Sequence, residues 1–164
     1  MSSGPRSPLS ITEVTSKAQM ARFIRLPMTL NAADPAWISP LISERQAALS
    51  PKSNPFFEHA EVQFWIASRD GRDVGRISAQ IDALSPTDPQ APAGNFGMIA
   101  AEDDAEVFAK LLETAEAWLK ARGCVTALGP LNLSINGEVG LLVDGFDTPP
   151  MVMMGHDPPY VGGQ

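Results

Sequence analysis

The sequence predicts an α/β (α+β) fold, a mixed and largely antiparallel central sheet flanked by helices. Three observations predict it. Residues 59–82 carry the alternating pattern of a β-hairpin, residues 103–123 carry the apolar stripe of a long amphipathic helix, and residues 9–30 read as a strand followed by a helix. The predicted order of elements is β-α-α-β-β-β-α-β, so three consecutive strands lie between the second and the third helix.

Composition places the chain among globular proteins of one domain. It has 164 residues, of which 44% are hydrophobic and 19% charged, and a domain of this length buries enough surface to fold without a metal or a disulfide. Twelve basic and nineteen acidic side chains give a net charge of −7. Because nucleic-acid binding needs a concentrated basic patch, no nucleic-acid partner is expected.

Cysteine usage and hydropathy bear on the compartment. Cys124 is the only cysteine, so an internal disulfide and a thiolate metal cluster are both excluded. Residues 1–10 lack the apolar core of a signal peptide and are expected to form a flexible tail. No run approaches the roughly 20 apolar residues that span a bilayer. A cytoplasmic protein is predicted, with contact to a membrane surface at most.

The first elements follow from local signals. Residues 9–15 alternate apolar and polar side chains and predict a strand. Ser16 is a suitable N-cap for a helix over residues 17–30, and a second helix is predicted over residues 41–49, before Pro51. The segment that follows contains two prolines and is expected to be irregular.

The hairpin prediction depends on the turn and on the alternation around it. Asp70-Gly71 is the dipeptide that a tight turn with positive φ prefers. The return strand runs over residues 74–82, and Gly75 is a candidate bulge. Side chains on the first strand are expected to alternate between the two faces of the sheet, with Val62, Phe64 and Ile66 on one face and Gln63, Trp65 and Ala67 on the other.

Three further strands and the long helix complete the prediction. A short apolar strand is expected over residues 95–101, and the helix of residues 103–123 ends at Gly123. Residues 124–130 are predicted to form a buried strand with Cys124 as an inert core residue. The methionine-rich residues 151–154 are a further candidate strand, which a missing partner region would leave half-covered.

Several blocks of the sequence resemble one family. The blocks lie between residue 11 and about residue 160, and they are "DPAWISPL", "NPFFEHAEVQFWIASRDGRDVGRISAQID", "AEAWLKARG", "GPLNLSINGEVGLLVDGFDTPPMVMM" and "DPPY". They are similar to the N-terminal half of the bacterial ceramide-synthase-like proteins, which have the GNAT fold of acyl-CoA N-acyltransferases. The resemblance implies a GNAT-like domain over residues 11–164, the N-terminal half of a longer two-half protein.

The resemblance also implies a reaction. An acyl group would pass from acyl-CoA, as co-substrate, to an amine, which in the best-known branch of the family is a sphingoid base. The hairpin would supply the central strands beside which the thioester lies. No metal cofactor is implied. The C-terminal half of the same protein, or a second copy of this chain, is the expected protein partner.

Two features depart from the pattern of the GNAT fold. The place of its glycine-rich pyrophosphate loop reads "GMIAAEDDAE", without a glycine pair. Three carboxylates, those of Glu102, Asp103 and Asp104, stand there instead and would repel an anion. This loop is therefore not expected to hold CoA in the usual way. The chain also stops just where the matched block stops, so it is expected to be a fragment that is inactive alone.

The densest group of polar candidates lies in residues 129–146. Amine acylation needs a base for the ammonium proton and donors for the oxyanion. Glu138 is the predicted catalytic base, and Asn132, Ser134 and Asn136 are predicted to bind substrate. The alternative is that asparagine and glycine shape a turn before a helix, with Ser134 or Asn136 as its N-cap.

Other candidates are open to more than one interpretation. His59 and Trp65, at the hairpin, are added as substrate-binding residues, although a loop histidine and a core tryptophan are the simpler alternatives. His156 is distant in sequence and forms no triad pattern with His59. Trp37, Phe56 and Phe57 can line an acyl-chain groove or belong to the core.

Three function classes remain open. The first is a GNAT-type N-acyltransferase, and the second is a non-catalytic binding or interaction half-domain. The third, a Mg²⁺-dependent nucleotide pyrophosphohydrolase, would use the carboxylates of residues 103–116. The i to i+4 pairs Glu106–Lys110 and Glu116–Lys120 oppose it, because they indicate a solvated helix face.

Overall fold

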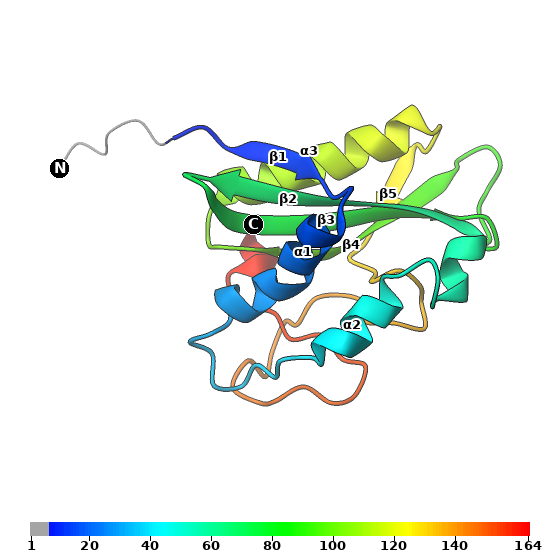
Figure 1. The fold of residues 1–164 in the computed structure, drawn as a ribbon. Helices are drawn as coiled ribbons and strands as arrows, with labels where there is room; N and C mark the ends of the chain where they lie inside the picture. The colour runs from blue at the N-terminus through cyan, green and yellow to red at the C-terminus, as the bar shows by residue number, and fades with distance from the viewer. Residues whose placement is uncertain (1–6) are drawn as a thin grey trace.

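The computed structural model describes residues 7–164, and its centre is a five-stranded sheet (Figure 1). The strands lie in the order of the chain, and the first four are antiparallel to their neighbours, whereas the last runs parallel to the fourth. This arrangement confirms the predicted fold class. The strands are β1 (Ser10–Glu13), β2 (Ala60–Arg69), β3 (Arg72–Asp82), β4 (Ala93–Ala101) and β5 (Thr126–Leu128).

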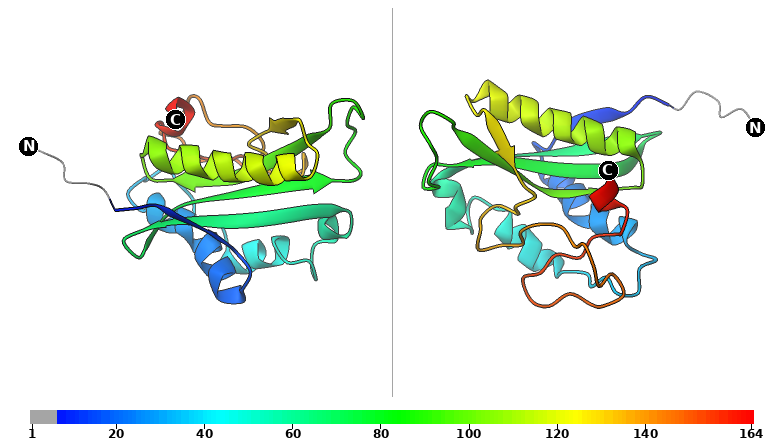
Figure 2. Two further views of the ribbon diagram at one scale, coloured as in Figure 1. Left: turned by 90° about the horizontal axis from the view of Figure 1, so that it is seen from above. Right: turned by 180° about the vertical axis from the view of Figure 1, so that it is seen from behind.

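Helices cover both faces of the sheet. Helices α1 (Lys17–Leu30) and α2 (Ile42–Ala48) lie on one face, and α3 (Ala105–Ala121) lies on the other (Figure 2). Two short 3₁₀ turns, η1 (Pro55–Glu58) and η2 (Val161–Gly163), complete the elements. Of the predicted tail, residues 1–6 fall outside the described residues, and β1 already begins at Ser10.

Helix boundaries follow the capping signals of the sequence. Ser16 accepts a hydrogen bond from the Gln19 N–H while the Gln19 side chain accepts from the Ser16 N–H, which forms a capping box at α1. Asp104 caps α3 by accepting from the Glu106 N–H at 3.0 Å. Gly123, with φ of +87°, stops α3, because the left-handed conformation favours glycine.

The β2–β3 hairpin is closed by the predicted turn. Asp70 and Gly71 both have positive φ, 54° and 73°, as a type I′ turn requires. Ala67 pairs with Gly75 and Ser68 with Asp73, so Val74 is the extra residue of a bulge next to the predicted position.

Two apolar clusters form the core, one on each face. Between the sheet and α3 lie Trp65 and Ala67 from β2, with Leu111 and Leu119 from α3. The other cluster joins Phe23 of α1 to residues of β2, and its members include Phe64, Ile66, Leu49, Phe56, Met98 and Leu133. The alternation predicted for β2 is therefore confirmed.

Strand β4 contains a second bulge. Arg76 pairs with Ala100 and Ser78 with Gly97, so that Met98 and Ile99 stand opposite the single residue Ile77. Met98 has a φ of +50°. The bulge turns the Met98 N–H away from the ladder, where it becomes available to a side chain from another segment.

Two predicted strands differ in the structure. β5 has only three residues and is an edge strand rather than a buried one, with Val125 69% and Leu128 53% exposed. Within residues 7–164 it pairs only with β4, and Thr126 and Leu128 are exposed, whereas Ala127 is partly buried against the cluster beneath α3. The strand predicted over residues 151–154 is wrong: these residues form an exposed turn closed by the Met154 N–H to Met151 O bond, because no strand edge lies beside them.

None of the helices within residues 7–164 is both long enough and apolar enough to cross a membrane.

Candidate functional site

A cavity of about 160 Å³ lies on the face of the sheet that α1 and α2 cover. Its walls come from both helices, from β3 and β4, and from the two loops that follow β5. Apolar side chains form most of the wall, and a small group of charged and amide side chains lies among them. Such a mixture is typical of ligand pockets. The polar group consists of Asn31, Arg45, Arg76, Asn132, Glu138, His156 and Asp157.

Strand β3 supplies a row of buried polar side chains to this face. Arg76, Ser78 and Gln80 alternate with apolar residues that face α3, and Ser78 and Gln80 are fully buried. Gln80 donates through its Nε2 to the backbone oxygens of Leu131 (2.7 Å) and Leu133 (3.2 Å). The row therefore anchors the segment after β5 across the sheet.

That segment is a hairpin-like loop over residues 130–140. The Gly140 N–H donates to Pro130 O, and the Asn132 N–H donates to Glu138 O, both at 2.9 Å. Gly97 in β4 allows the loop to approach, since a Cβ there would lie 2.0 Å from Leu131 O. No helix begins between residues 130 and 160, so the alternative of a helix N-cap at Ser134 or Asn136 is wrong.

Asn132 connects the loop to the bulge in β4. Its Oδ1 accepts the Met98 N–H at 2.6 Å, and its Nδ2 donates to Glu138 Oε2 at 2.9 Å. One side chain thus satisfies the amide that the bulge releases and orients the carboxylate of Glu138. Because the Asn132 amide donates to the Glu138 carboxylate, the carboxylate acts as a hydrogen-bond acceptor at the cavity wall.

Glu138 also faces a cation. Its Oε1 lies 3.7 Å from a terminal nitrogen of Arg45, and the two side chains are 31% and 33% exposed. At this distance the two side chains form an ion pair but no hydrogen bond. Oε1 of Glu138 is therefore able to accept a proton or a hydrogen bond from a ligand.

Arg76 lies in the cavity wall. It donates to Phe23 O at 2.8 Å and stacks on the Phe23 ring at 4.7 Å. Burial, together with the charge of Arg45, lowers the pKa of Arg76 to about 9, and Glu138 opposes this change. The guanidinium therefore keeps its charge at neutral pH.

The opposite wall contains a second acidic group. Asp157 accepts the Leu142 N–H at 3.1 Å, and its pKa is raised by burial and by the charge of Glu138. Its neighbour His156 is almost wholly buried and bonds Asp34 at 2.9 Å. This contact fixes the last loop of the chain against the loop after α1.

The predicted site residues fall into two groups. Asn132 and Glu138 line the cavity and contact each other. Ser134 lies at the tip of the loop, where its hydroxyl accepts the Asn136 N–H, and Asn136 is exposed. Neither of these two lines the cavity, and their part in substrate binding stays a prediction.

The two hairpin candidates lie elsewhere. His59 bonds Asp82 at 2.7 Å and packs edge-on against Phe56, at the end of the hairpin. Trp65 is 3% exposed and packs against Trp118 between the sheet and α3. Neither residue lines the cavity. Trp65 lies on the opposite face of the sheet, and His59 lies at the end of the hairpin beside Phe56.

The N-terminus of α3 is occupied by ion pairs. Asp104 and Glu106 both contact Arg69, with the Asp104 contact at 2.7 Å, and Glu102 pairs with Arg72 at 3.0 Å. Side chains of Arg69 and Asp104 are only 10% and 11% exposed. This helix end, which would attract an anionic ligand, therefore already holds carboxylates of the chain itself.

The acidic side chains of α3 pair differently from the sequence expectation. Lys110 bonds Glu113 at 2.6 Å instead of Glu106. Within the described part of the chain, no group of three or more His, Cys, Asp or Glu side chains is arranged to hold a metal.

Sequence reasoning missed three residues of the cavity, namely Arg45, Arg76 and Asp157. Arg76 carried a usable signal, because it begins the row Arg76, Ser78 and Gln80 on a central strand that helices cover on both faces. Polar residues at such positions are buried rather than solvated. Nothing in the local sequence around Arg45 or Asp157 distinguishes it from a surface residue.

The fold is that of GNAT acetyltransferases. One similar structure is the aminoglycoside acetyltransferase AAC(6′)-Iy, solved with a CoA bisubstrate analogue. The match covers 79% of this chain and 84% of that protein, with a TM-score of 0.55 and 17% identity. Another is a tandem GNAT protein from the clavulanic acid biosynthesis pathway. This match covers 71% of this chain and 34% of that protein, with a TM-score of 0.53 and 13% identity.

Two curated proteins are similar in sequence, although no family model matches. The bacterial ceramide synthase of Caulobacter vibrioides is 63% identical over 155 residues, which are 94% of this chain and 40% of that protein. Protein YghO of Escherichia coli is 48% identical over 145 residues, 88% of this chain and 37% of that protein. The resemblance to ceramide-synthase-like proteins is therefore confirmed, and the chain spans about two fifths of the length of these relatives.

Proposed function

We propose that this chain is part of an N-acyltransferase that transfers an acyl group from acyl-CoA to an amine, with a sphingoid base as the acceptor. Glu138, whose carboxylate Asn132 orients, accepts one proton from the ammonium, and the resulting amine attacks the carbonyl carbon of the thioester. The C–S bond then breaks, and CoA leaves as the thiol after taking up the second proton that the nitrogen loses. The observation that carries the proposal is the Asn132–Glu138 pair in the wall of a cavity that is lined by both apolar and charged side chains. The 63% identity to a ceramide synthase supports the choice of acceptor.

The CoA pyrophosphate is proposed to bind outside this chain. Carboxylates paired with Arg69 and Arg72 fill the N-terminus of α3, where Coulomb repulsion would oppose another anion. The relatives are more than twice as long as the matched region, so their remaining length has room for a second domain. By this proposal the present chain binds the acceptor side of the reaction.

A domain exchange tests the proposal. The matched 155 residues of the Caulobacter relative are replaced by this chain, and thiol release from a long-chain acyl-CoA is measured with sphinganine. The protein with the exchanged domain is expected to release thiol from the acyl-CoA. The 164-residue chain alone is expected to release none. Glu138→Gln is expected to lower kcat by about 10²-fold or more, because the amide cannot accept the proton.

Glu116→Gln is the matched control, since Glu116 is an exposed residue of α3 away from the cavity. It should leave turnover unchanged. Full activity of the Glu138→Gln protein would show that Glu138 is not the proton acceptor. Turnover by the isolated chain would refute the proposal that the CoA pyrophosphate binds outside this chain.

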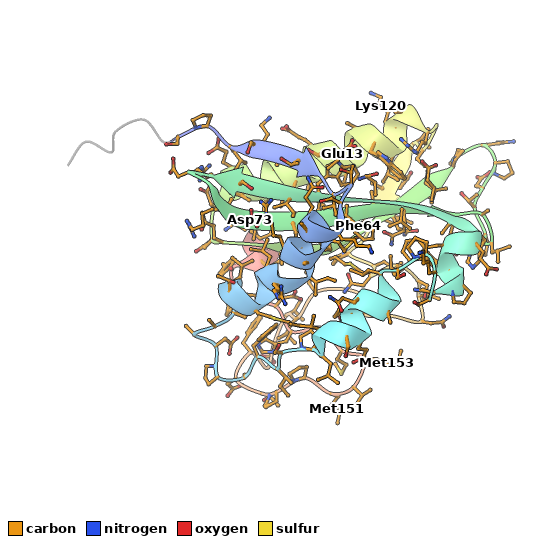
Figure 3. All side chains as sticks on the ribbon, viewed as in Figure 1. Glu13, Phe64, Asp73, Lys120, Met151 and Met153 are labelled. Atoms are coloured by element: carbon orange, nitrogen blue, oxygen red, sulfur yellow. The ribbon has the colours of Figure 1, made fainter. Side chains whose placement is uncertain are left out.

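A non-catalytic interaction half-domain is the second candidate. The observation that favours it is an exposed apolar loop, in which Met151 is 76%, Val152 92% and Met153 62% exposed. Figure 3 shows Met151 and Met153 beneath α2, on the side away from β1 and β2. Thermal stabilisation of the chain by acyl-CoA would favour the enzyme, whereas indifference to acyl-CoA together with self-association would favour the interaction domain.

A further inference from the structure

The two cavity arginines have hydrogen-bond donors to spare. The Nε atoms of Arg45 and Arg76 are buried, and neither donates to an acceptor within residues 7–164. Arg76 makes one hydrogen bond, to Phe23 O, and Arg45 has Glu138 only at 3.7 Å. Buried guanidinium donors are costly to leave without an acceptor, so this pair is suited to an additional oxygen ligand.

Local charge defines the ligand further. The charges that act on Arg76 are those of Arg45, which repels it, and Glu138, which attracts it. Asp157 and the His156–Asp34 pair stand at the opposite wall, and the charges acting on Asp157 are those of Glu138 and His156. The cavity lining thus contains two guanidiniums, Arg45 and Arg76, and two carboxylates, Glu138 and Asp157. A ligand with one negative charge adds less unbalanced charge to this group than a phosphate dianion does.

Apolar side chains share the cavity with the arginines. Ile24, Leu49 and Met98 line it, and Trp37 and Pro27 line it as well. A hydrocarbon chain gains free energy by leaving water for such walls. A planar guanidinium fork matches the two oxygens of a carboxylate.

We propose that this cavity is a binding site for the carboxylate of a long-chain amphiphile, with Arg45 and Arg76 holding the carboxylate oxygens and the apolar wall holding the start of the alkyl chain. The site shares the cavity with the proposed base. The inference nevertheless concerns equilibrium binding alone and does not require acyl transfer, so it can fail or succeed independently of the proposed function.

Titration of the chain with single-chain probes tests it. Decanoate is compared with decanol, decyl phosphate and decyltrimethylammonium by calorimetry, while the Arg Nε–Hε resonances are followed by NMR. Decanoate is expected to bind most tightly and to shift the resonances of Arg45 and Arg76. Arg45→Met and Arg76→Met should each weaken decanoate binding by about tenfold or more, because each removes a charge-assisted hydrogen bond.

Arg25→Met is the control, because Arg25 is exposed on α1 and does not line the cavity. It should bind decanoate as the unchanged chain does. If Arg76→Met fails to fold, Arg45→Met decides, since Arg45 is partly exposed and contacts only Glu138 weakly. Equal binding of decanol, tighter binding of decyl phosphate, no binding of decanoate, or unchanged affinity in Arg45→Met would each overturn the proposal.

Discussion

At the scale of single residues, Asn132 has the largest structural role in the cavity. Its amide oxygen accepts the Met98 N–H of the β4 bulge, and its amide nitrogen donates to Glu138. Met98 is 7% exposed, so its amide has little access to water. An asparagine suits this position because it alone among small side chains offers one acceptor and one donor side by side.

Asn132→Ala is expected to lower the free energy of unfolding by about 1–3 kcal/mol, because it leaves a buried amide without an acceptor. Urea denaturation of the chain measures the change. Asn136→Ala is the matched control: Asn136 is exposed in the same loop, and its truncation should change stability by less than about 0.5 kcal/mol. Equal stability of the two variants would contradict the role given to Asn132.

At the scale of elements, the contact between β3 and α3 depends on the absence of a side chain at Gly75. A Cβ there would lie 2.8 Å from Val107 Cγ1 and 2.9 Å from Leu111 Cδ1. The glycine therefore lets the helix approach the strand beside the Val74 bulge. Bulge and close approach occur together because the bulge keeps both Val74 and Gly75 on the α3 side.

Gly75→Ala is expected to destabilise the chain by about 1–3 kcal/mol through overpacking. In a Val107→Ala background the cost should fall, because the nearest clashing methyl group is gone, and a double-mutant cycle measures a coupling of about 0.5–3 kcal/mol. Gly155→Ala, with nothing within 4 Å of the added Cβ, serves as control. Additive effects of the two substitutions would show that α3 does not rest on Gly75.

At the scale of the whole molecule, apolar surface is distributed unevenly. The two cores lie on either side of the sheet, yet several large apolar side chains remain exposed on the loops after β5, among them Ile135, Val143, Met151, Val152 and Met153. A group of exposed apolar side chains on loops marks a surface suited to contact with another domain or another copy.

The isolated chain is therefore expected to self-associate with rising concentration, as measured by analytical ultracentrifugation. Met151→Ser with Val152→Ser should weaken this association while leaving the melting temperature unchanged, since both side chains are exposed. Leu84→Ser is the control, because Leu84 is 72% exposed on the β3–β4 connection. A loss of association in the control alone would exclude the loop as the contact surface.

Prediction from sequence succeeded where the signal is local. Ser16, the Asp70-Gly71 turn and Gly123 each mark an element boundary that the structure confirms. It failed for residues 151–154, where apolar character indicated a strand although pairing depends on a distant partner edge. For the site, the spacing of Asn132 and Glu138 in one short loop was readable, whereas Arg45 and Arg76 come from elements far apart in the sequence.

The class of fold, the caps and turns, and the apolar faces of β2 and α3 could all be predicted from the sequence, because periodicity and capping act within a few residues. The tertiary structure alone decided that Arg45, Arg76, Asn132 and Glu138 share one cavity. It also decided that, of the carboxylates before α3, Asp104 pairs with Arg69 and Glu102 with Arg72. Charge pairing and burial depend on which segments meet across the sheet, and residue spacing does not contain that information.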